Sequence, residues 1–224
     1  MYPTAGAPRL RFVLVAALTM AVVTGCSRSP ADGSADAGFA RDMATHHAQA
    51  VDMGFLVRDR TRDEPLRALA TDIIVTQSAQ RGIFMAWLQQ WGLPQASPGP
   101  RMAWMKNGGH MGAMGSGQPM TGSMSAHGAP AMPGSPRMIG MASETELDAL
   151  RHAEGHDAEV LFLQLMIRHH EGGVLMAQDV LEQSHRNEVV TLARSVASGQ
   201  TGEIKAMTTM LRDRGAEPLP TLLK

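Results

Sequence analysis

Apolar residues recur every three or four positions in four segments of the chain, a spacing typical of helices that pack on one face. The first segment, within residues 36–60, carries Phe39, Met43, His46, Ala50, Met53 and Val57. The second carries Leu69, Ile73, Gln77, Gln80, Phe84 and Leu88. The third carries Phe162, Met166, His169, Gly173, Met176 and Val180, and the fourth carries Leu192, Val196, Gln200, Glu203, Met207 and Leu211. No alternating pattern of the kind that predicts strands competes with these helices.

The later two segments repeat the earlier two at a constant offset of 123 residues, from His46 to His169. Each copy has a Phe, a Met, two consecutive His and a second Met at the same spacing. In the following helix Gln77 corresponds to Gln200, and Gln80 corresponds to Glu203. A match of this kind over about sixty residues indicates an internal duplication, so we expect two similar helical hairpins.

The stretch between the copies has a different composition. Residues 93–142 hold ten of the 23 glycines and nine of the 18 methionines, with frequent Pro and little charge, which predicts a loop. Ser143 followed by Glu146 predicts a capped helix start directly after it. We therefore predict an all-α, ferritin-like four-helix bundle, with hairpins at 36–94 and 143–217 joined by a Met/Gly/Pro-rich loop at 95–142. Residues 36–217 would form one domain.

The N-terminal residues have the pattern of an export signal. Arg9 and Arg11 precede an apolar run, Phe12 to Val23, that is too short to span a bilayer. The run ends in Val-Thr-Gly-Cys26, which resembles the bacterial lipobox and contains the only cysteine of the chain. We predict that residues 1–25 are a lipoprotein signal peptide, that Cys26 is lipidated and that residues 26–35 are a flexible tether. The protein would then be lipid-anchored in the cell envelope, on the extracytoplasmic side of the bacterial membrane.

Charge and composition exclude several functions. The net charge is −1, and removal of residues 1–25 with their two Arg leaves 18 basic against 21 acidic residues, or −3. Without a basic patch or a set of stacking aromatics, no nucleic-acid partner is expected. No local signature of a nucleophile and its base is present, so we do not predict an enzyme. Once Cys26 is lipidated, Met, His and carboxylates remain as possible metal ligands.

The duplicated His-His pairs are the candidate metal ligands. Because adjacent helical residues point about 100° apart, the spacing directs His46 and His169 inward and leaves His47 and His170 on the flank, toward a neighbouring helix or solvent. The small residues Ala50 and Gly173 would leave room beside the inward rings. Imidazole and thioether groups bind soft and borderline metals. The predicted ligands are His46, His47, Met43 and Met53 in the first copy, and His169, His170, Met166 and Met176 in the second; one shared ion and two separate ions are both open.

Other polar groups could support or extend this site. A buried Gln needs a hydrogen-bond partner, so we expect Gln77 and Gln200 to bond the inward imidazoles and orient them for a metal, with Glu203 in a similar supporting position. Within the loop, spaced thioether and imidazole groups could wrap around Cu(I), which accepts few and soft ligands. These possible loop ligands are Met102, Met105, His110, Met111, Met114, Met120, Met124 and His127.

Packing offers a simpler explanation of the same residues. Methionines at this helical spacing normally fill a core, and an inward His with a Gln partner can be a satisfied polar group. A Gly- and Met-rich loop can also be only a spacer. Repetition of the His pair with a Met one turn before it, in both copies, favours metal binding over packing alone.

The motif resembles that of the domain of unknown function 305 family, a group of exported bacterial proteins placed among ferritin-like bundles. The residues that match in the first copy are Asp36, Phe39, Met43, His46, His47 and Met53, and in the second Phe162, Met166, His169, His170 and Met176. Some members of that family are associated with copper binding or resistance, so the resemblance implies a helical bundle and a link to copper. Di-iron bundles use Glu-x-x-His on two helices, whereas here that spacing occurs only from Glu182 to His185.

Three functions follow in order of support. The first is a lipid-anchored metal-binding protein that sequesters or passes on copper through His and Met, with the membrane contacted through the lipid on Cys26 and any protein partner unknown. The second is a metal-free structural or interaction module of the cell envelope. The third is a ferritin-like redox enzyme.

Overall fold

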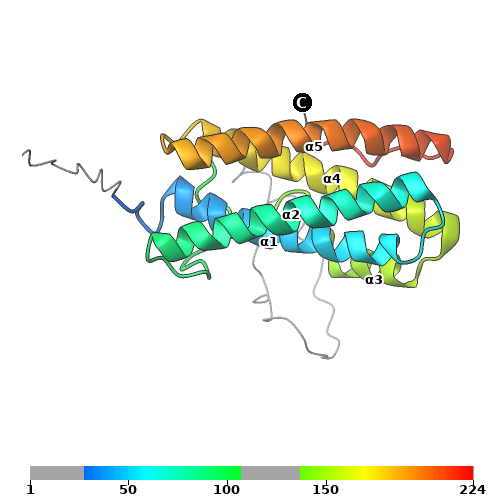
Figure 1. Ribbon diagram of the computed structural model, residues 1–224, viewed down its shortest axis with the longest axis horizontal. Coiled ribbons are helices and arrows are strands. Elements are labelled where there is room, and N and C mark those ends of the chain that lie inside the picture. Colours follow the sequence, from blue (N-terminus) through cyan, green and yellow to red (C-terminus); the bar gives the residue numbers. More distant parts are fainter. Residues whose placement is uncertain (1–27, 107–136, 224) are drawn as a thin grey trace, which may run out of the picture.

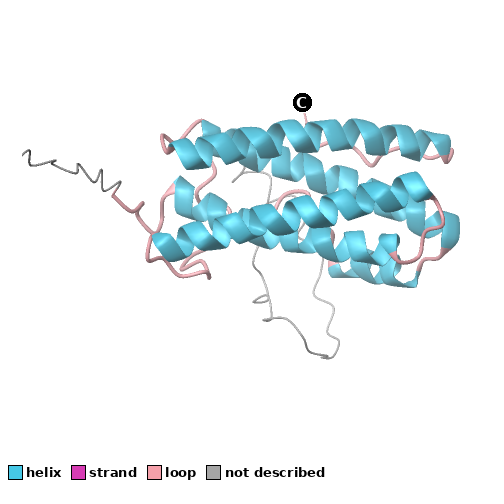
Figure 2. Ribbon diagram, viewed as in Figure 1, coloured by secondary structure: helices cyan, strands magenta, loops and turns pink. Residues whose placement is uncertain are grey.

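The protein is helical wherever the structure describes it. A computed structural model describes residues 28–106 and 137–223, and within those ranges it contains helices and loops without strands (Figure 2). The helices are α1 (Ala35–Arg58), α2 (Glu64–Gln90), α3 (Glu144–His152), α4 (Gly155–Leu181) and α5 (Asn187–Asp213). The predicted all-α class is therefore confirmed. No helix in the described ranges combines the length and the hydropathy needed to cross a bilayer.

Two antiparallel hairpins build the bundle, α1 with α2 and α4 with α5 (Figure 1). The hairpins meet through α1 and α4, which run side by side in opposite directions. Helix α2 ends at one end of the bundle and α4 begins at the other, so the connection that contains α3 runs along the bundle (Figure 1). This is the crossover arrangement that the long middle segment predicts.

The helix ends follow from local sequence. Ser143 and Glu146 form the predicted capping box at the start of α3. Gly92 and Gly215, which are 123 positions apart, both have φ of 70° directly after α2 and α5. Residues with a Cβ rarely adopt this conformation, so the two copies end their hairpins with the same glycine turn.

The core is divided into three parts along the bundle axis. A proximal cluster, at the end where α1 begins, includes Phe39, Met43, Phe84, Leu88, Met102, Met105, Met138, Met176, Val180, Val189 and Val196. A distal cluster, at the end where α1 finishes, includes Met53, Val57, Leu66, Ile73, Leu150, Phe162, Met166, Met207 and Leu211. Between them lies a polar layer of the buried residues His46, His47, Gln77, His169, His170 and Gln200, with the partly exposed Gln80 and Glu203 at its rim.

The crossover begins as a segment that is pinned to the bundle. The carboxylate of Asp42 accepts hydrogen bonds from the backbone N–H of Met102 at 2.7 Å and from the indole N–H of Trp104 at 2.9 Å. The carboxylate of Asp179 accepts one from the N–H of Lys106 at 2.9 Å. Met102 and Met105 are buried in the proximal cluster. These two methionines therefore do not lie in a free loop, and their role as possible metal ligands stays a prediction.

The remaining possible loop ligands lie outside the described residues, namely His110, Met111, Met114, Met120, Met124 and His127. The chain is described again from residue 137, and it returns across α1 and α4 in close contact. The side-chain amide of Gln49 both donates to the carbonyl of Ala142 and accepts from its N–H, at 3.0 and 2.8 Å. A Cβ on Gly172 would lie 2.3 Å from the carbonyl oxygen of Ile139. Both contacts hold the returning segment against the two central helices.

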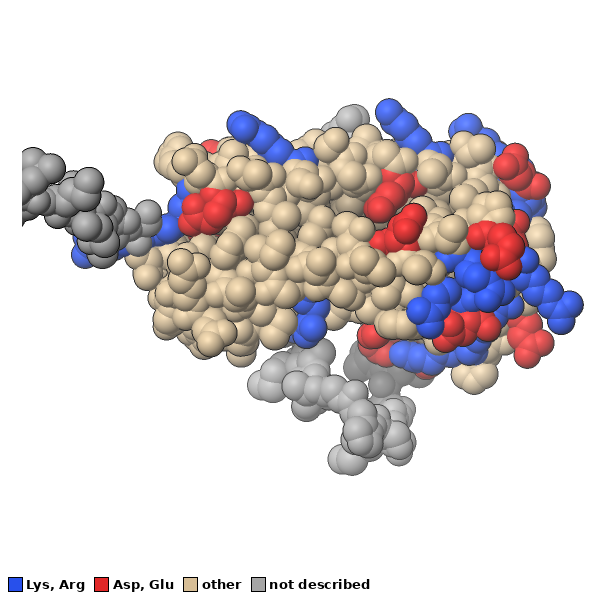
Figure 3. Space-filling view, viewed as in Figure 1, with Lys and Arg blue, Asp and Glu red and all other residues tan. Residues whose placement is uncertain are grey.

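Charge is distributed unevenly over the surface. Arg, Lys, Asp and Glu side chains gather at the end of the bundle that holds α3, whereas the part of the α2 and α5 face nearer the start of α1 is largely uncharged (Figure 3). One ion pair at the α3 end is bidentate: the guanidinium of Arg168 donates to both carboxylate oxygens of Glu146 at 2.8 Å. This pair lowers the pKa of Glu146 from 4.5 to about 2 and ties α3 to α4.

Replacement of Gly172 by Ala tests the docking of the crossover. The added methyl group would overlap the Ile139 backbone, so we expect Gly172→Ala to lower the free energy of unfolding by about 1–3 kcal/mol, measured by urea titration. Gly199→Ala is the matched control, because its Cβ would meet nothing within 4 Å in the middle of α5. The control should raise stability by about 0.4–1 kcal/mol. Equal effects of the two substitutions would contradict the close contact.

Candidate metal centre

Two imidazole rings stack where the central helices cross. The centroids of His46 on α1 and His169 on α4 are 3.7 Å apart, with an angle of 31° between the ring planes, and neither side chain is exposed. The inward orientation predicted for both residues is what the structure shows. The Nε2–H of His169 donates to the carbonyl oxygen of His46 at 3.1 Å. Because a carbonyl only accepts, this bond places the proton on Nε2 and leaves a lone pair on Nδ1 of His169.

The second His of each pair turns toward the outer helix of its own hairpin. His47 bonds the Oε1 of Gln80 on α2, and His170 bonds the Oε2 of Glu203 on α5, each through Nε2 at 2.7 Å. Both rings are fully buried, so of the two orientations predicted the helix-facing one is observed. Gln80 was absent from the predicted site although its alignment with Glu203 in the repeat could have indicated it.

The predicted role of Gln77 and Gln200 is not observed. Both side chains are buried, and neither amide forms a hydrogen bond with any described residue, so the expected bond to an inward imidazole is missing. The Gln200 amide lies directly over Gly173, where an added Cβ would come within 2.2 Å of Oε1. The space that Gly173 was predicted to leave beside the imidazole is thus occupied by this amide.

The buried imidazoles of His46, His47 and His169 are held in their neutral form. Burial lowers the pKa of His46 and His47 from 6.5 to about 3, because a charged ring would lose its hydration. Neighbouring imidazoles lower the pKa of His46 further, and the backbone of Ile139 opposes the shift, although it does not reach hydrogen-bond geometry with either ring nitrogen. Burial and the three other rings also lower the pKa of His169 well below its usual value. Neutral imidazole is the form that binds metal ions.

Several buried nitrogen atoms in the polar layer lack a partner among the described residues. Both ring nitrogens of His46 form no hydrogen bond, and neither do the Nδ1 atoms of His47, His169 and His170. Unpaired buried polar atoms are costly, and lone pairs of neutral imidazoles are ready metal donors. Thioethers lie on both sides of the layer, with Met43 and Met176 in the proximal cluster and Met53 and Met166 in the distal one.

This donor set fits one kind of ion better than others. In the described part of the chain no group of three or more His, Cys, Asp or Glu side chains converges enough to hold a metal. Zn²⁺ and Cu(II) normally take three or four such nitrogen and oxygen or thiolate ligands. Paired imidazoles with nearby thioethers instead suit a soft monovalent cation such as Cu(I), which accepts few ligands.

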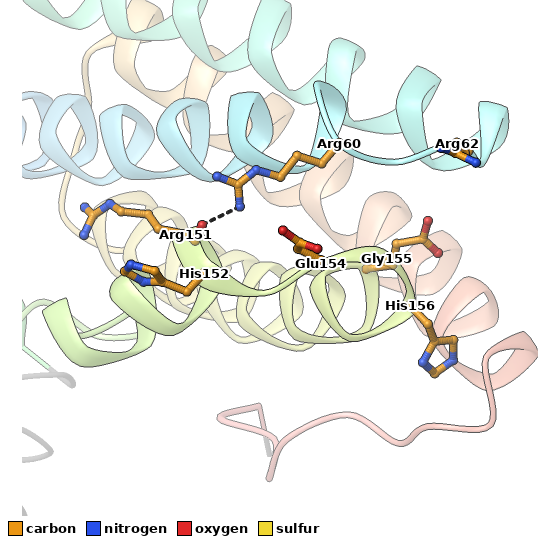
Figure 4. A pocket seen from close by; sticks show the side chains of 8 residues that line it. Arg60, Arg62, Arg151, His152, Glu154, Gly155 and His156 are labelled. Carbon is orange, nitrogen blue, oxygen red and sulfur yellow. Dashed lines mark hydrogen bonds between the residues drawn. The ribbon is translucent and has the colours of Figure 1, made fainter.

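The described surface also has an open pocket away from these residues. It has a volume of about 720 Å³ and is lined by loop and helix-end residues of α1, α3 and α4, including Arg60, Arg151, Glu154 and His156 (Figure 4). Arg60 crosses it to donate to the carbonyl of Arg151 at 2.7 Å (Figure 4). None of the predicted ligands lines this pocket.

The fold and the buried residues define a class of protein: an all-α bundle of two similar hairpins that encloses paired His and Met side chains. The chain belongs to the family described as domain of unknown function (DUF305), whose model matches residues 36–211. The resemblance noted in the sequence is therefore confirmed.

Three solved structures are similar to the chain over most of their length. A DUF305 protein from Streptomyces coelicolor, predicted to be secreted, is 41% identical, with a TM-score of 0.69 over 84% of this chain and 99% of that one. A DUF305 fragment from Deinococcus radiodurans is 33% identical, with a TM-score of 0.59 over 80% and 96%. CopM in its Cu(II)-bound form is 25% identical, with a TM-score of 0.55 over 80% and 97%. Curated proteins give no match.

The buried imidazoles predict a stability that falls in mild acid. In the metal-free protein the unfolded chain takes up protons at pH 6.5, whereas folded His46 and His47 do so only near pH 3. Stability should therefore decrease as the pH falls below 6.5, by about 1.4 kcal/mol per pH unit for each such ring, until about pH 3. Urea titrations between pH 7 and 5, above the range of most carboxylates, measure this slope. His46→Gln should make it shallower, and an unchanged slope would contradict the neutral buried ring.

Proposed function

We propose that the protein is an exported, lipid-anchored metal-binding protein that sequesters copper or passes it on as Cu(I). One observation carries the proposal: His46 buries both ring nitrogens without a hydrogen bond, against the ring of His169, whose Nδ1 is also unpartnered. The proposed ligands are the four His of the polar layer and the four Met on either side of it, which are Met43, Met53, Met166 and Met176.

The chemistry of these groups supports binding in the envelope. Imidazoles that remain neutral in the folded protein do not have to lose a proton when a metal binds. Thioethers carry no proton at all, so they bind equally well in mild acid. Cu(I) is stable with two or three soft ligands, which matches a layer where described His and carboxylate groups do not converge in threes.

Relatives support the same function and location. CopM, which has the same fold, has been crystallised with Cu(II), and the Streptomyces coelicolor protein is predicted to be secreted. Cys26, which we propose as the site of lipid attachment, lies outside the described residues. We propose a binding role rather than catalysis. The metal-free structural module remains the competing outcome of the experiment below.

A Cu(I) titration against a competing chelator tests the proposal, with a chain that begins at residue 27 so that the thiol of Cys26 cannot bind copper. His46→Ala/His169→Ala removes the stacked rings, so we expect the bundle to lose at least one tightly bound ion. His152→Ala/His156→Ala is the matched control, since these two His line the open pocket and should leave binding unchanged. Equal and weak binding by wild type and both variants would favour the metal-free module.

The contribution of the loop is measured separately. Replacement of Met111, Met114, Met120 and Met124 by Leu preserves chain length and leaves the pinned residues Met102 and Met105 intact. If the loop binds copper, this replacement should lower the number of Cu(I) ions bound per chain in the same titration. Its effect and the effect of the His double substitution should then add together. An unchanged stoichiometry would restrict binding to the bundle.

A further inference from the structure

The two copies of the His pair differ in the charge of the group behind them. His47 and Gln80 are 33 residues apart, as are His170 and Glu203, and both Nε2-to-oxygen distances are 2.7 Å. Geometry is therefore repeated while chemistry is not: an amide stands in the first copy where a carboxylate stands in the second. The two copies of the site therefore differ in charge although they share the same His-His motif.

The carboxylate fixes the protonation of His170. Ionised Glu203 can only accept, so His170 carries its proton on Nε2 and directs the Nδ1 lone pair, which has no partner among the described residues, into the interior. Gln80 can present either its oxygen or its NH₂ group to His47. The tautomer of His47 is thus less constrained, and its Nδ1 is a less certain donor.

Glu203 is also the only carboxylate of the polar layer. The other seven members are His and Gln, all uncharged when the imidazoles are neutral, and an oxygen of Glu203 lies 2.7 Å from Nε2 of His170. A cation placed in a buried layer without a counter-charge loses its hydration with little compensation. A carboxylate that bonds the far side of a ligating imidazole compensates for this and makes the ring a stronger donor.

We infer that the two halves of the site are unequal and that Glu203 directs the first soft monovalent cation to the second copy, at His170. This inference rests on the proposed function. Glu203 acts through His170 as a positioning residue. Binding at His47, which lacks a carboxylate behind it, follows at higher metal concentration.

Reciprocal substitutions separate charge from geometry. Glu203→Gln keeps a hydrogen-bond acceptor but removes the charge. Gln80→Glu places a carboxylate behind His47 in the first copy, as Glu203 stands behind His170 in the second. The double variant Glu203→Gln/Gln80→Glu has the composition of wild type with the carboxylate moved. Each is titrated as the full mature chain with Ag(I), and with Cu(I) under reducing conditions, while ¹⁵N NMR of the imidazoles identifies which ring responds first.

We expect the His170 signals to shift before those of His47 in wild type, with the first affinity about 10–100-fold above the second. Glu203→Gln should lower the first affinity by a similar factor, Gln80→Glu should raise the second, and the double variant should make His47 respond first. If Glu203 had a purely structural role, Glu203→Gln would weaken both binding steps together. The double variant would then not make His47 respond first.

Two negative results have different meanings. If wild type binds the metal but Glu203→Gln leaves both affinities and the order of the NMR shifts unchanged, the inference is wrong and the proposed function stands. If wild type shows no imidazole response to either ion, the proposed function fails at the bundle and the inference fails with it.

Discussion

Four imidazole rings without access to water, at the middle of a helical bundle, are the constraint on which the structure depends. Burial keeps at least three of the rings neutral, and two of them stack where α1 crosses α4. Apolar clusters lie on both sides of the layer, so the atoms of its buried rings must find partners within it or remain unpaired. Under the proposed function, stability and metal affinity would depend on the same lone pairs, and a bound ion would stabilise the fold by mass action.

The repeated sequence pattern accounts for the symmetry of the layer, and the crossover accounts for the limits of that symmetry. The bonds from His47 and His170 to the outer helices are copies of each other. The symmetry fails where the crossover lies, because a single connection cannot contact both copies in the same way. Gln49 of the first copy binds Ala142 through two hydrogen bonds, whereas its counterpart Gly172 must lack a Cβ because the backbone of Ile139 passes close to it. The first copy thus holds the crossover with a side chain, and the second leaves space for its backbone.

Helical periodicity was sufficient to predict the fold class, the two hairpins and the inward turn of His46 and His169, and the Ser143–Glu146 motif predicted the capping box. Periodicity describes which face of a helix is buried, but it does not specify which polar groups will meet between helices. Gln77 and Gln200 were consequently expected to bond the inward imidazoles, whereas Gln80 and Glu203, one turn further along each helix, bond the flanking His. The burial of Met102 and Met105 was also missed, because it depends on the carboxylates of Asp42 and Asp179, which lie far away in the chain.

Those two carboxylates fasten the chain to the bundle just before the described residues end at 106. The chain that is described again from 137 is fastened by different groups, Gln49 and the packing on Gly172. The two ends of the crossover therefore have separate attachments, so a substitution that weakens one attachment leaves the contacts of the other in place.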